Sequence, residues 1–395
     1  MYKEVRLKKG KEAPSLRFHP WIFSGAIESV SDNIAEGETV KVIDSEGKTI
    51  GFGDWQIGSI AVRLISFGNI AIDEDFLMKK ITDAIILRKK LGLLREDNDI
   101  CRLIHGEGDF LPGLIVDLYG STAVVQAHSP GMHYRRMLIS RILQNNGVLN
   151  VKSVFYKSES TLPYKADLGA TDGYLTATEG DFIAHENGLN FHIDWLRGQK
   201  TGFFIDQREN RHLLERYSEG KRVLNMFCYT GGFSVYALRG KAEKVVSVDS
   251  SAKAIAVTEE NVKMNFGPEI VNKHEAVIGD AFTYIDNVPK NDFDLIVLDP
   301  PAFAKHRKAL TNALRGYQRL NAKAIKKIAP GGLLFTFSCS QAVNKEQFRL
   351  SVFSAAAESG RKVRILNQLT QPDDHPINIY HPEGEYLKGL VLYVE

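Results

Sequence analysis

The chain has 395 residues, of which 44% are hydrophobic and 25% charged, and its formal net charge is +2. These values are typical of a globular protein with two or three domains and a large buried core. No apolar run is long enough to span a bilayer and no signal peptide is recognisable, while the three widely spaced cysteines (Cys101, Cys228 and Cys339) form neither a disulfide framework nor a zinc site. We therefore expect a cytoplasmic protein without a metal.

Residues 1–72 contain short alternating runs broken by glycine, which predict a small β-domain. Its first 17 residues carry six basic side chains against two acidic ones. In the stretch RFHPWIFSGAI we interpret Trp21 and Phe23 as core residues rather than nucleic-acid contacts.

Residues 73–180 predict an α+β domain. Apolar spacing indicates a helix over 76–92 and another over 132–144, with strands at 114–120, 122–128 and 151–157. A hairpin over 181–194 then leads into the last region.

Residues 181–395 predict an α/β domain after this hairpin. Seven apolar strand candidates alternate with mostly helical patterns, at 223–227, 244–249, 276–280, 294–299, 333–338, 363–366 and 389–394. Several are continuously apolar, which indicates a largely parallel sheet covered on both faces. Ligands of such sheets bind at the carboxyl ends of the strands, where Asp249, Asp280 and Asp299 stand.

The run VLNMFCYTGGFSVYAL (223–238) predicts a strand, a glycine turn and a helix, where the backbone can approach a ligand closely. It lacks the dinucleotide fingerprint G-x-G-x-x-G. An acid after the second strand can accept from ribose hydroxyls, and one after the third from an adenine amine. The pattern predicts S-adenosylmethionine, bound by the loop, the acids and their neighbours: Asn225, Phe227, Tyr229, Thr230, Gly231, Gly232, Asp249, Ser250, Asp280, Ala281 and Asp299.

Asp206 and Glu209 match a capping box at the start of a helix. Arg208 lies between them, where its charge opposes the helix dipole, so we expect it to meet an anion such as the cofactor carboxylate.

Asp299 is followed by Pro300, Pro301, Ala302 and Phe303. Prolines stop a sheet at this point, and the motif predicts a shelf for a planar base. The stretch 305–327 carries eight basic side chains and no acid, so we expect Lys305, Arg315 and Arg319 to contact a polyanion.

Cys339 also follows a predicted strand, between Ser338 and Ser340. Most single cysteines are core residues, and we assign that role to Cys228. The hydroxyls and basic residues near Cys339 favour a reactive thiolate instead.

The chain resembles the PUA-domain-containing bacterial 23S ribosomal RNA (cytosine-5)-methyltransferases over essentially its whole length. The resemblance rests on HPWIFSGAI, GFFIDQREN, VLNMFCYTGGFSVYA, DPPAFAK, FSCSQAV and DDHPINIYHPEGEYLKG. It implies an N-terminal PUA domain, a central α+β domain, a seven-stranded class I methyltransferase domain and often a homodimer. It also implies that Cys339 is the nucleophile, with Asp299 holding the base. Ala302 stands where another branch of RNA cytosine-5 enzymes has a second cysteine, which leaves uracil open as the target base.

Two alternatives remain at this stage. Methylation of an exocyclic amine or ring nitrogen on the Asp-Pro-Pro-Ala-Phe shelf would need no cysteine. A non-catalytic RNA-binding protein with a vestigial cofactor fold would need neither Asp249 nor Cys339.

Overall fold

The computed structural model describes residues 2–163, 168–304 and 307–395. The chain forms two compact units. The first comprises Met1–Gly188, Ile193–Ile205 and Asp373–Gly384, and the second comprises Leu189–His192, Asp206–Pro372 and Glu385–Glu395. These two units group the chain differently from the predicted domains, since Asp373–Gly384 belongs to the first unit. The predicted domain boundaries, 1–72, 73–180 and 181–395, stay predictions.

The first unit begins with a six-stranded sheet in the order β2-β6-β5-β4-β1-β3. Its strands are β1 (Lys3–Leu7), β2 (Trp21–Phe23), β3 (Ile27–Val30), β4 (Thr39–Ile43), β5 (Thr49–Trp55) and β6 (Ile60–Phe67), with the short helix α1 (Ala13–Leu16) between the first two. A small apolar core around Val5, Val40 and Leu64 holds the sheet together. Phe23 is 46% exposed, so its prediction as a core residue is wrong, whereas Trp21 is half-buried.

The remainder of the first unit is an α+β arrangement around a five-stranded sheet in the order β11-β10-β9-β8-β7. Helix α2 spans Glu74–Lys90 and is capped by the Asp73 carboxylate, which accepts from the Phe76 N–H. The predicted helical run 132–144 divides into two helices. The elements are β7 (Ile100–His105), β8 (Leu114–Tyr119), β9 (Thr122–Ala127), α3 (Pro130–Tyr134), α4 (Arg136–Asn145), β10 (Ser153–Tyr156) and β11 (Gly173–Tyr174). The predicted hairpin segment contains strand β12 (Ile183–Glu186), which belongs to the first unit, and strand β13 (Leu189–His192), which belongs to the second.

The second unit is built on a seven-stranded sheet in the order β16-β15-β14-β17-β18-β20-β19, and all seven predicted strands belong to it. They are β14 (Arg222–Met226), β15 (Lys244–Asp249), β16 (His274–Ile278), β17 (Leu295–Leu298), β18 (Gly332–Ser338), β19 (Val363–Leu369) and β20 (Lys388–Val394). The five neighbouring strands β16, β15, β14, β17 and β18 pair in parallel. Strand β20 is antiparallel to both of its neighbours, β18 and β19. The run of four residues in β17 is wholly buried, as a strand covered on both faces must be.

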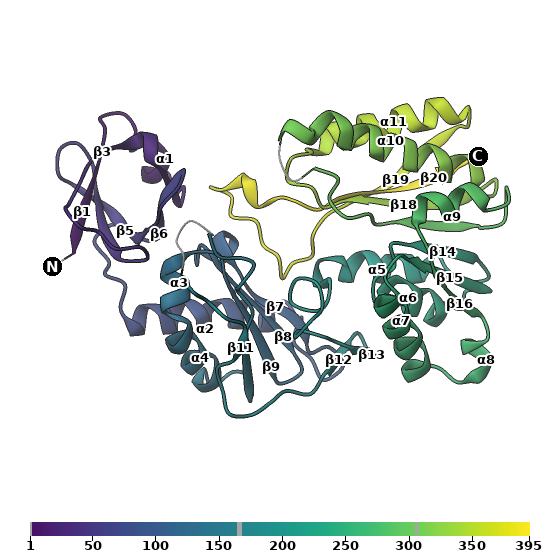
Figure 1. Cartoon of the computed structure of the whole chain (residues 1–395), viewed down its shortest axis with the longest axis horizontal. Coiled ribbons are helices and arrows are strands. Elements are labelled where there is room, and N and C mark those ends of the chain that lie inside the picture. The colour runs from purple at the N-terminus through teal and green to yellow at the C-terminus, as the bar shows by residue number, and fades with distance from the viewer. Residues whose placement is uncertain (1, 164–167, 305–306) are drawn as a thin grey trace. The chain divides into compact units, whose positions relative to one another are not determined.

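Helices cover both faces of this sheet (Figure 1): α5, α6 and α7 lie on one side, and α10 and α11 on the other. Their bounds are α5 (Arg208–Arg216), α6 (Gly232–Arg239), α7 (Ala252–Asn265), α8 (Pro268–Val271), α9 (Ala281–Asn287), α10 (Leu310–Lys327) and α11 (Lys345–Ser359). One apolar cluster joins the strands to α9, α10 and α11. The sheet and these three helices thus share one core, which fixes the carboxyl ends of β14 to β18 as a rigid edge.

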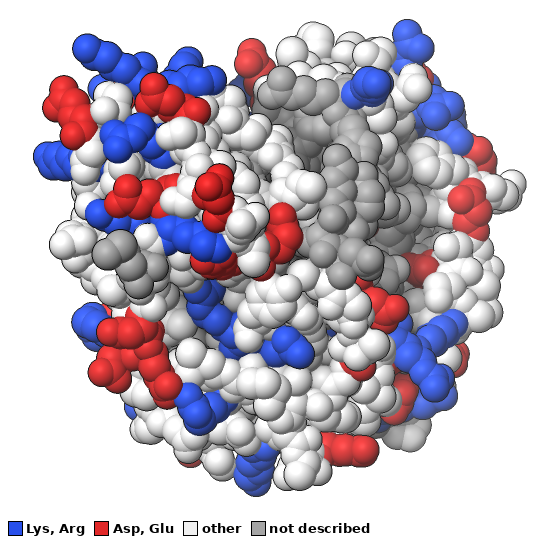
Figure 2. Space-filling model, turned by 60° about the vertical axis from the view of Figure 1, so that its left-hand side comes forward, with Lys and Arg blue, Asp and Glu red and all other residues white. Residues whose placement is uncertain are grey.

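Charged side chains of both signs are interspersed on the face drawn in Figure 2. Within the basic stretch 1–17, Lys3 forms an ion pair with Glu38, and Arg6 donates to two loop carbonyls. None of the helices in the described ranges has the length and apolar character needed to cross a membrane.

Candidate active site

The loop between β14 and α6 has an unusual backbone. Phe227, Tyr229 and Gly231 all have positive φ angles, of 60°, 50° and 76°. At Gly231 a Cβ atom would lie 2.4 Å from Cγ2 of Thr258, so this position has no room for any other residue. The strained turn leaves the first turn of α6 without a side-chain cap, since Gly231 is its N-cap residue. The N–H groups there can therefore receive an anion.

Two side chains of helix α7 hold this loop in place through hydrogen bonds. The Thr258 hydroxyl donates to the Tyr229 carbonyl over 2.9 Å, and the Asn261 amide donates to the Thr230 carbonyl over 2.9 Å. Both side chains are fully buried. They hold the predicted cofactor loop in place, and the sequence alone did not reveal them because they lie about thirty residues further along the chain.

Asp249 ends β15 and accepts two backbone hydrogen bonds. Its Oδ2 accepts from the Tyr229 N–H at 3.0 Å, and its Oδ1 from the Ser251 N–H at 2.9 Å. Each carboxylate oxygen keeps a second lone pair for a ligand hydroxyl. The position fits the predicted ribose contact, and the neighbouring Ser250 is exposed.

Asp280 caps helix α9. Its Oδ1 accepts from both the N–H and the hydroxyl of Thr283 at 2.8 Å, and the Thr283 N–H is the main reason that the pKa of Asp280 is lowered. The exposed carboxylate still has Oδ2 for an adenine amine, whereas the adjoining Ala281 is buried. The cap and the predicted ligand contact are compatible.

Asn225 lies beneath the loop, 1% exposed, and its amide donates to the Ser234 hydroxyl over 2.8 Å. That hydroxyl lies 2.6 Å from the Ser247 hydroxyl, which in turn lies 2.7 Å from Nε2 of His274. This buried polar chain links β14, α6, β15 and β16. Asn225 therefore supports the cofactor loop through its amide, and its predicted contact with the cofactor stays a prediction.

The predicted capping box at α5 is wrong. The N-cap residue is Gln207, without a side-chain cap, and Asp206 instead accepts from the Tyr386 hydroxyl at 2.6 Å. Glu209 lies 3.4 Å from Nε of Arg208. Arg208 is 1% exposed and forms an ion pair with Glu209, and its predicted contact with the cofactor carboxylate stays a prediction.

The Asp-Pro-Pro-Ala-Phe segment leaves the sheet after β17. Asp299 is half-buried and Oδ2 accepts from the Gln207 amide at 3.0 Å. Pro300 is buried, while Pro301 is exposed at the start of the loop. The ring centroids of Phe303 and of Tyr317 on α10 lie 4.7 Å apart, so this packing anchors the loop to the helix.

Cys339 directly follows β18, next to the strand that ends before Asp299. It is partly exposed, whereas Cys101 and Cys228 are buried. Burial raises the pKa of Cys228 to about 12, in agreement with the core role predicted for it. The two serines beside Cys339 are structural: Ser338 donates to the Tyr317 hydroxyl at 2.9 Å and Ser340 to the Ala304 carbonyl at 2.6 Å.

The pKa of the Tyr317 hydroxyl responds to both candidate catalytic groups, Cys339 and Asp299. Its pKa is raised to about 12, first by burial, and negative charge at Cys339 and at Asp299 raises it further. Both charges therefore act on the same buried hydroxyl. Because β17 and β18 are parallel neighbours, Asp299 and Cys339 follow the carboxyl ends of adjacent strands, and their catalytic roles stay predictions.

Comparison with known proteins agrees with this geometry. Residues 174–382 match the S-adenosylmethionine-dependent methyltransferase family, and residues 5–67 match a PUA-like domain. Ribosomal RNA large subunit methyltransferase I of Aeromonas hydrophila is 40% identical over 399 residues, covering 99% of both chains. Its namesake from Escherichia coli O127:H6 is 37% identical over 396 residues, covering 98% of both. The chain belongs to this family of S-adenosylmethionine-dependent methyltransferases.

Solved structures share the fold. A putative S-adenosylmethionine-dependent methyltransferase from Streptococcus mutans superposes with a TM-score of 0.82 at 21% identity, over 99% of this chain and 100% of its own. SMU.776, a putative methyltransferase complexed with SAH, gives a TM-score of 0.83 at 21% identity and the same coverage. The predicted α/β methyltransferase fold and the PUA-like domain are thereby confirmed.

The residues present fit S-adenosylmethionine, the cofactor of this methyltransferase family. The uncapped start of α6 suits the anionic end of the cofactor, and the fixed Asp249 carboxylate suits two hydroxyls. The part played by each residue stays a prediction.

Four of the basic residues of α10 fall into two pairs that differ in their contacts. Arg315 and Arg319 are exposed one helical turn apart, and neither forms an ion pair with any residue in the described ranges. Lys323 and Lys326 are instead paired with Asp286 and Glu358, at 2.7 and 2.9 Å. Lys305 lies outside the described residues. The predicted RNA contact therefore rests on the first half of the helix.

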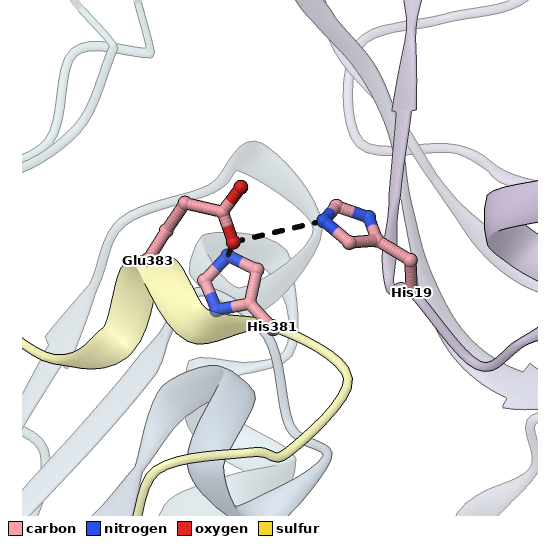
Figure 3. A group of neighbouring side chains, drawn as sticks. All are labelled: His19, His381 and Glu383. Carbon is pink, nitrogen blue, oxygen red and sulfur yellow. Dashed lines mark ion pairs between the residues drawn. The ribbon is translucent and has the colours of Figure 1, made fainter.

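His19, His381 and Glu383 form a cluster in the first unit (Figure 3). Glu383 Oε2 lies 3.8 Å from His19 Nε2 and 3.7 Å from His381 Nε2. The Trp21 N–H donates to His19 Nδ1 at 3.2 Å, so the neutral ring carries its proton on Nε2. A metal would need a lone pair on that nitrogen, and we therefore assign this cluster as a histidine–carboxylate contact.

Proposed function

We propose that this chain methylates C5 of a cytosine in 23S ribosomal RNA, with Cys339 as the nucleophile, and that it acts in the cytoplasm. The RNA target is inferred from the relatives, which are named as ribosomal RNA large subunit methyltransferases. The observation that carries the proposed chemistry is a partly exposed cysteine at the carboxyl end of β18, beside the strand that ends before Asp299.

The Cys339 thiolate is needed because C5 of a pyrimidine is not nucleophilic enough to take a methyl group by itself. The electron pair of the Cys339 thiolate forms a carbon–sulfur bond to C6 while the C5–C6 π bond breaks, and the displaced π electrons make C5 an enamine carbon. S-adenosylmethionine supplies the electrophilic methyl group. A base then takes the C5 proton, the carbon–sulfur bond breaks and the thiolate leaves.

Asp299 is proposed to hold the cytosine edge while the adduct forms. Its carboxylate can accept from the exocyclic amine, and the hydrogen bond from Gln207 holds its Oδ2 in place. Pro301 offers the exposed surface of the loop on which a flipped base can lie. Flipping the target nucleotide costs a few kcal/mol, which contacts to the RNA must offset.

The RNA itself is proposed to contact Arg315 and Arg319 and the PUA-like domain. A homodimer is implied by the family resemblance alone, and sedimentation of the full chain tests it.

Methylation of an exocyclic amine remains the second candidate because the Asp299–Phe303 segment would suit it. It assigns no purpose to Cys339. Base-resolved mapping of 5-methylcytosine in 23S RNA, with and without this protein, separates the candidates. The proposal requires one cytosine whose C5 methylation depends on the protein, and a modified uracil or amine in its place would contradict it.

A further inference from the structure

Lys388 is a buried cation behind Cys339 that the sequence did not single out. It begins β20 and pairs with Ser338 on β18, the residue before Cys339. The residue is 6% exposed, and its ammonium donates to the carbonyls of Ser340 and Val343, both at 2.6 Å. These bonds hold the turn that follows the cysteine.

Two carbonyls satisfy hydrogen bonds of the ammonium but do not neutralise its charge. A buried charge without an opposite charge is costly, and Lys388 forms no ion pair with a carboxylate among the described residues. Burial lowers the pKa of Lys388 to about 8, and the two influences that oppose this are negative charge at Cys339, the larger, and at Glu385. Glu385 is already paired with Lys345. Negative charge at Cys339 is thus the larger of the two influences that would stabilise this ammonium.

Other charged or titratable groups lie on the elements packed around Cys339. Negative charge at Cys339 and negative charge at Asp299 both raise the pKa of Tyr317 on α10. Negative charge at Asp299 disfavours a second negative charge nearby, and Tyr317 is neutral at ordinary pH because its pKa is about 12. Lys345, at the start of α11, already forms an ion pair with Glu385. Lys388 is a buried cation able to favour a thiolate here.

We propose that Lys388 is a positioning residue that keeps Cys339 in its thiolate form and fixes the turn that carries it. This inference rests on the proposed function, since it concerns the same nucleophile. A buried ammonium is screened little by solvent, so it acts on the sulfur more strongly than a surface lysine would.

The test is the pH dependence of iodoacetamide alkylation at Cys339, resolved by mass spectrometry of the peptide from the full chain. Lys388→Met keeps the length of the side chain without its charge. We expect the alkylation midpoint to rise by about one pH unit or more, which lowers the rate at pH 7 roughly tenfold. Lys345→Met, which removes a partly exposed charge, should move the midpoint by a few tenths at most.

S-adenosylmethionine affinity and the unfolding midpoint report whether Lys388→Met is folded. A folded variant with the wild-type alkylation midpoint would overturn the inference. Where the variant does not fold, the wild-type protein decides: a Cys339 midpoint well below the ordinary value of about 8.5 supports the inference, and one at or above it overturns it. These outcomes are independent of the proposed function, which fails separately if Cys339→Ala still transfers methyl groups.

Discussion

The amide of Gln207 donates to Oδ2 of Asp299 over 3.0 Å, and this joins the start of α5 to the loop after β17. Its orientation is set from behind, because Asn210 donates to the Gln207 carbonyl oxygen at 2.6 Å. Both amides are almost fully buried. The nitrogen of Gln207, rather than its oxygen, therefore faces the carboxylate.

Replacing Gln207 by Leu should lower kcat for methyl transfer about 10- to 100-fold, because a hydrogen bond to a charged group contributes roughly 1.5–3 kcal/mol. Asn210→Ala should cost less, since it only loosens the amide. Single-turnover rates at saturating cofactor measure both. A wild-type rate for Gln207→Leu would show that the hydrogen bond from Gln207 to Asp299 does not contribute to methyl transfer.

Asp249→Ala should weaken S-adenosylmethionine binding by about 1–3 kcal/mol, the cost of losing charge-assisted hydrogen bonds. Calorimetry measures the change. Glu260→Ala, which removes a half-exposed carboxylate from α7, is the charge control and should bind as wild type does. Equal affinities for the two variants would place Asp249 outside the cofactor site.

RNA affinity should fall with salt, with a slope of about −0.7 per phosphate neutralised on single-stranded RNA. Arg315→Gln with Arg319→Gln should reduce the magnitude of this slope by about 1.4. The matched pair Lys323→Gln and Lys326→Gln should change it less, because both lysines are already paired with acids. The reverse ranking would show that the first half of α10 is only a solvated face.

Acid should destabilise the second unit through His274. Burial lowers its pKa to about 4, against an ordinary value of 6.5. The unfolded chain therefore binds a proton that the folded chain does not between these values, and the free energy of unfolding falls as pH drops from about 6.5 to 4. His274→Asn should flatten this dependence in denaturant titrations of the full chain followed by hydrogen exchange at β15. An unchanged slope would show that other groups cause the acid sensitivity.

The sequence predicted the seven strands of the second unit because each is a buried apolar run. It missed β7 (Ile100–His105), where Arg102 interrupts the apolar pattern; its Nε lies 2.7 Å from the buried carboxylate of Asp117. Such pairing compensates a charge in a strand, but only the fold reveals the partner.

The capping box failed for a similar reason. Asp206 and Glu209 have the right spacing, yet the Tyr386 hydroxyl, 180 residues further on, occupies the Asp206 carboxylate. Gln207, Tyr317 and Lys388 escaped prediction because their importance comes from distant neighbours. Asp299 and Cys339 were predictable because both follow apolar strands, and the fold brings the ends of those strands together.

The most direct test of the central claim is covalent trapping on RNA that carries 5-fluorocytosine at the target position. Fluorine blocks the proton removal that releases the enzyme, so the wild-type protein should accumulate as an adduct in the presence of S-adenosylmethionine. The adduct should resist denaturation and map to Cys339 by mass spectrometry. Cys228→Ala should still form it, since that thiol is buried with a pKa of about 12, and Cys339→Ala should form none. Methyl transfer by Cys339→Ala without any adduct would contradict the covalent mechanism and favour amine methylation.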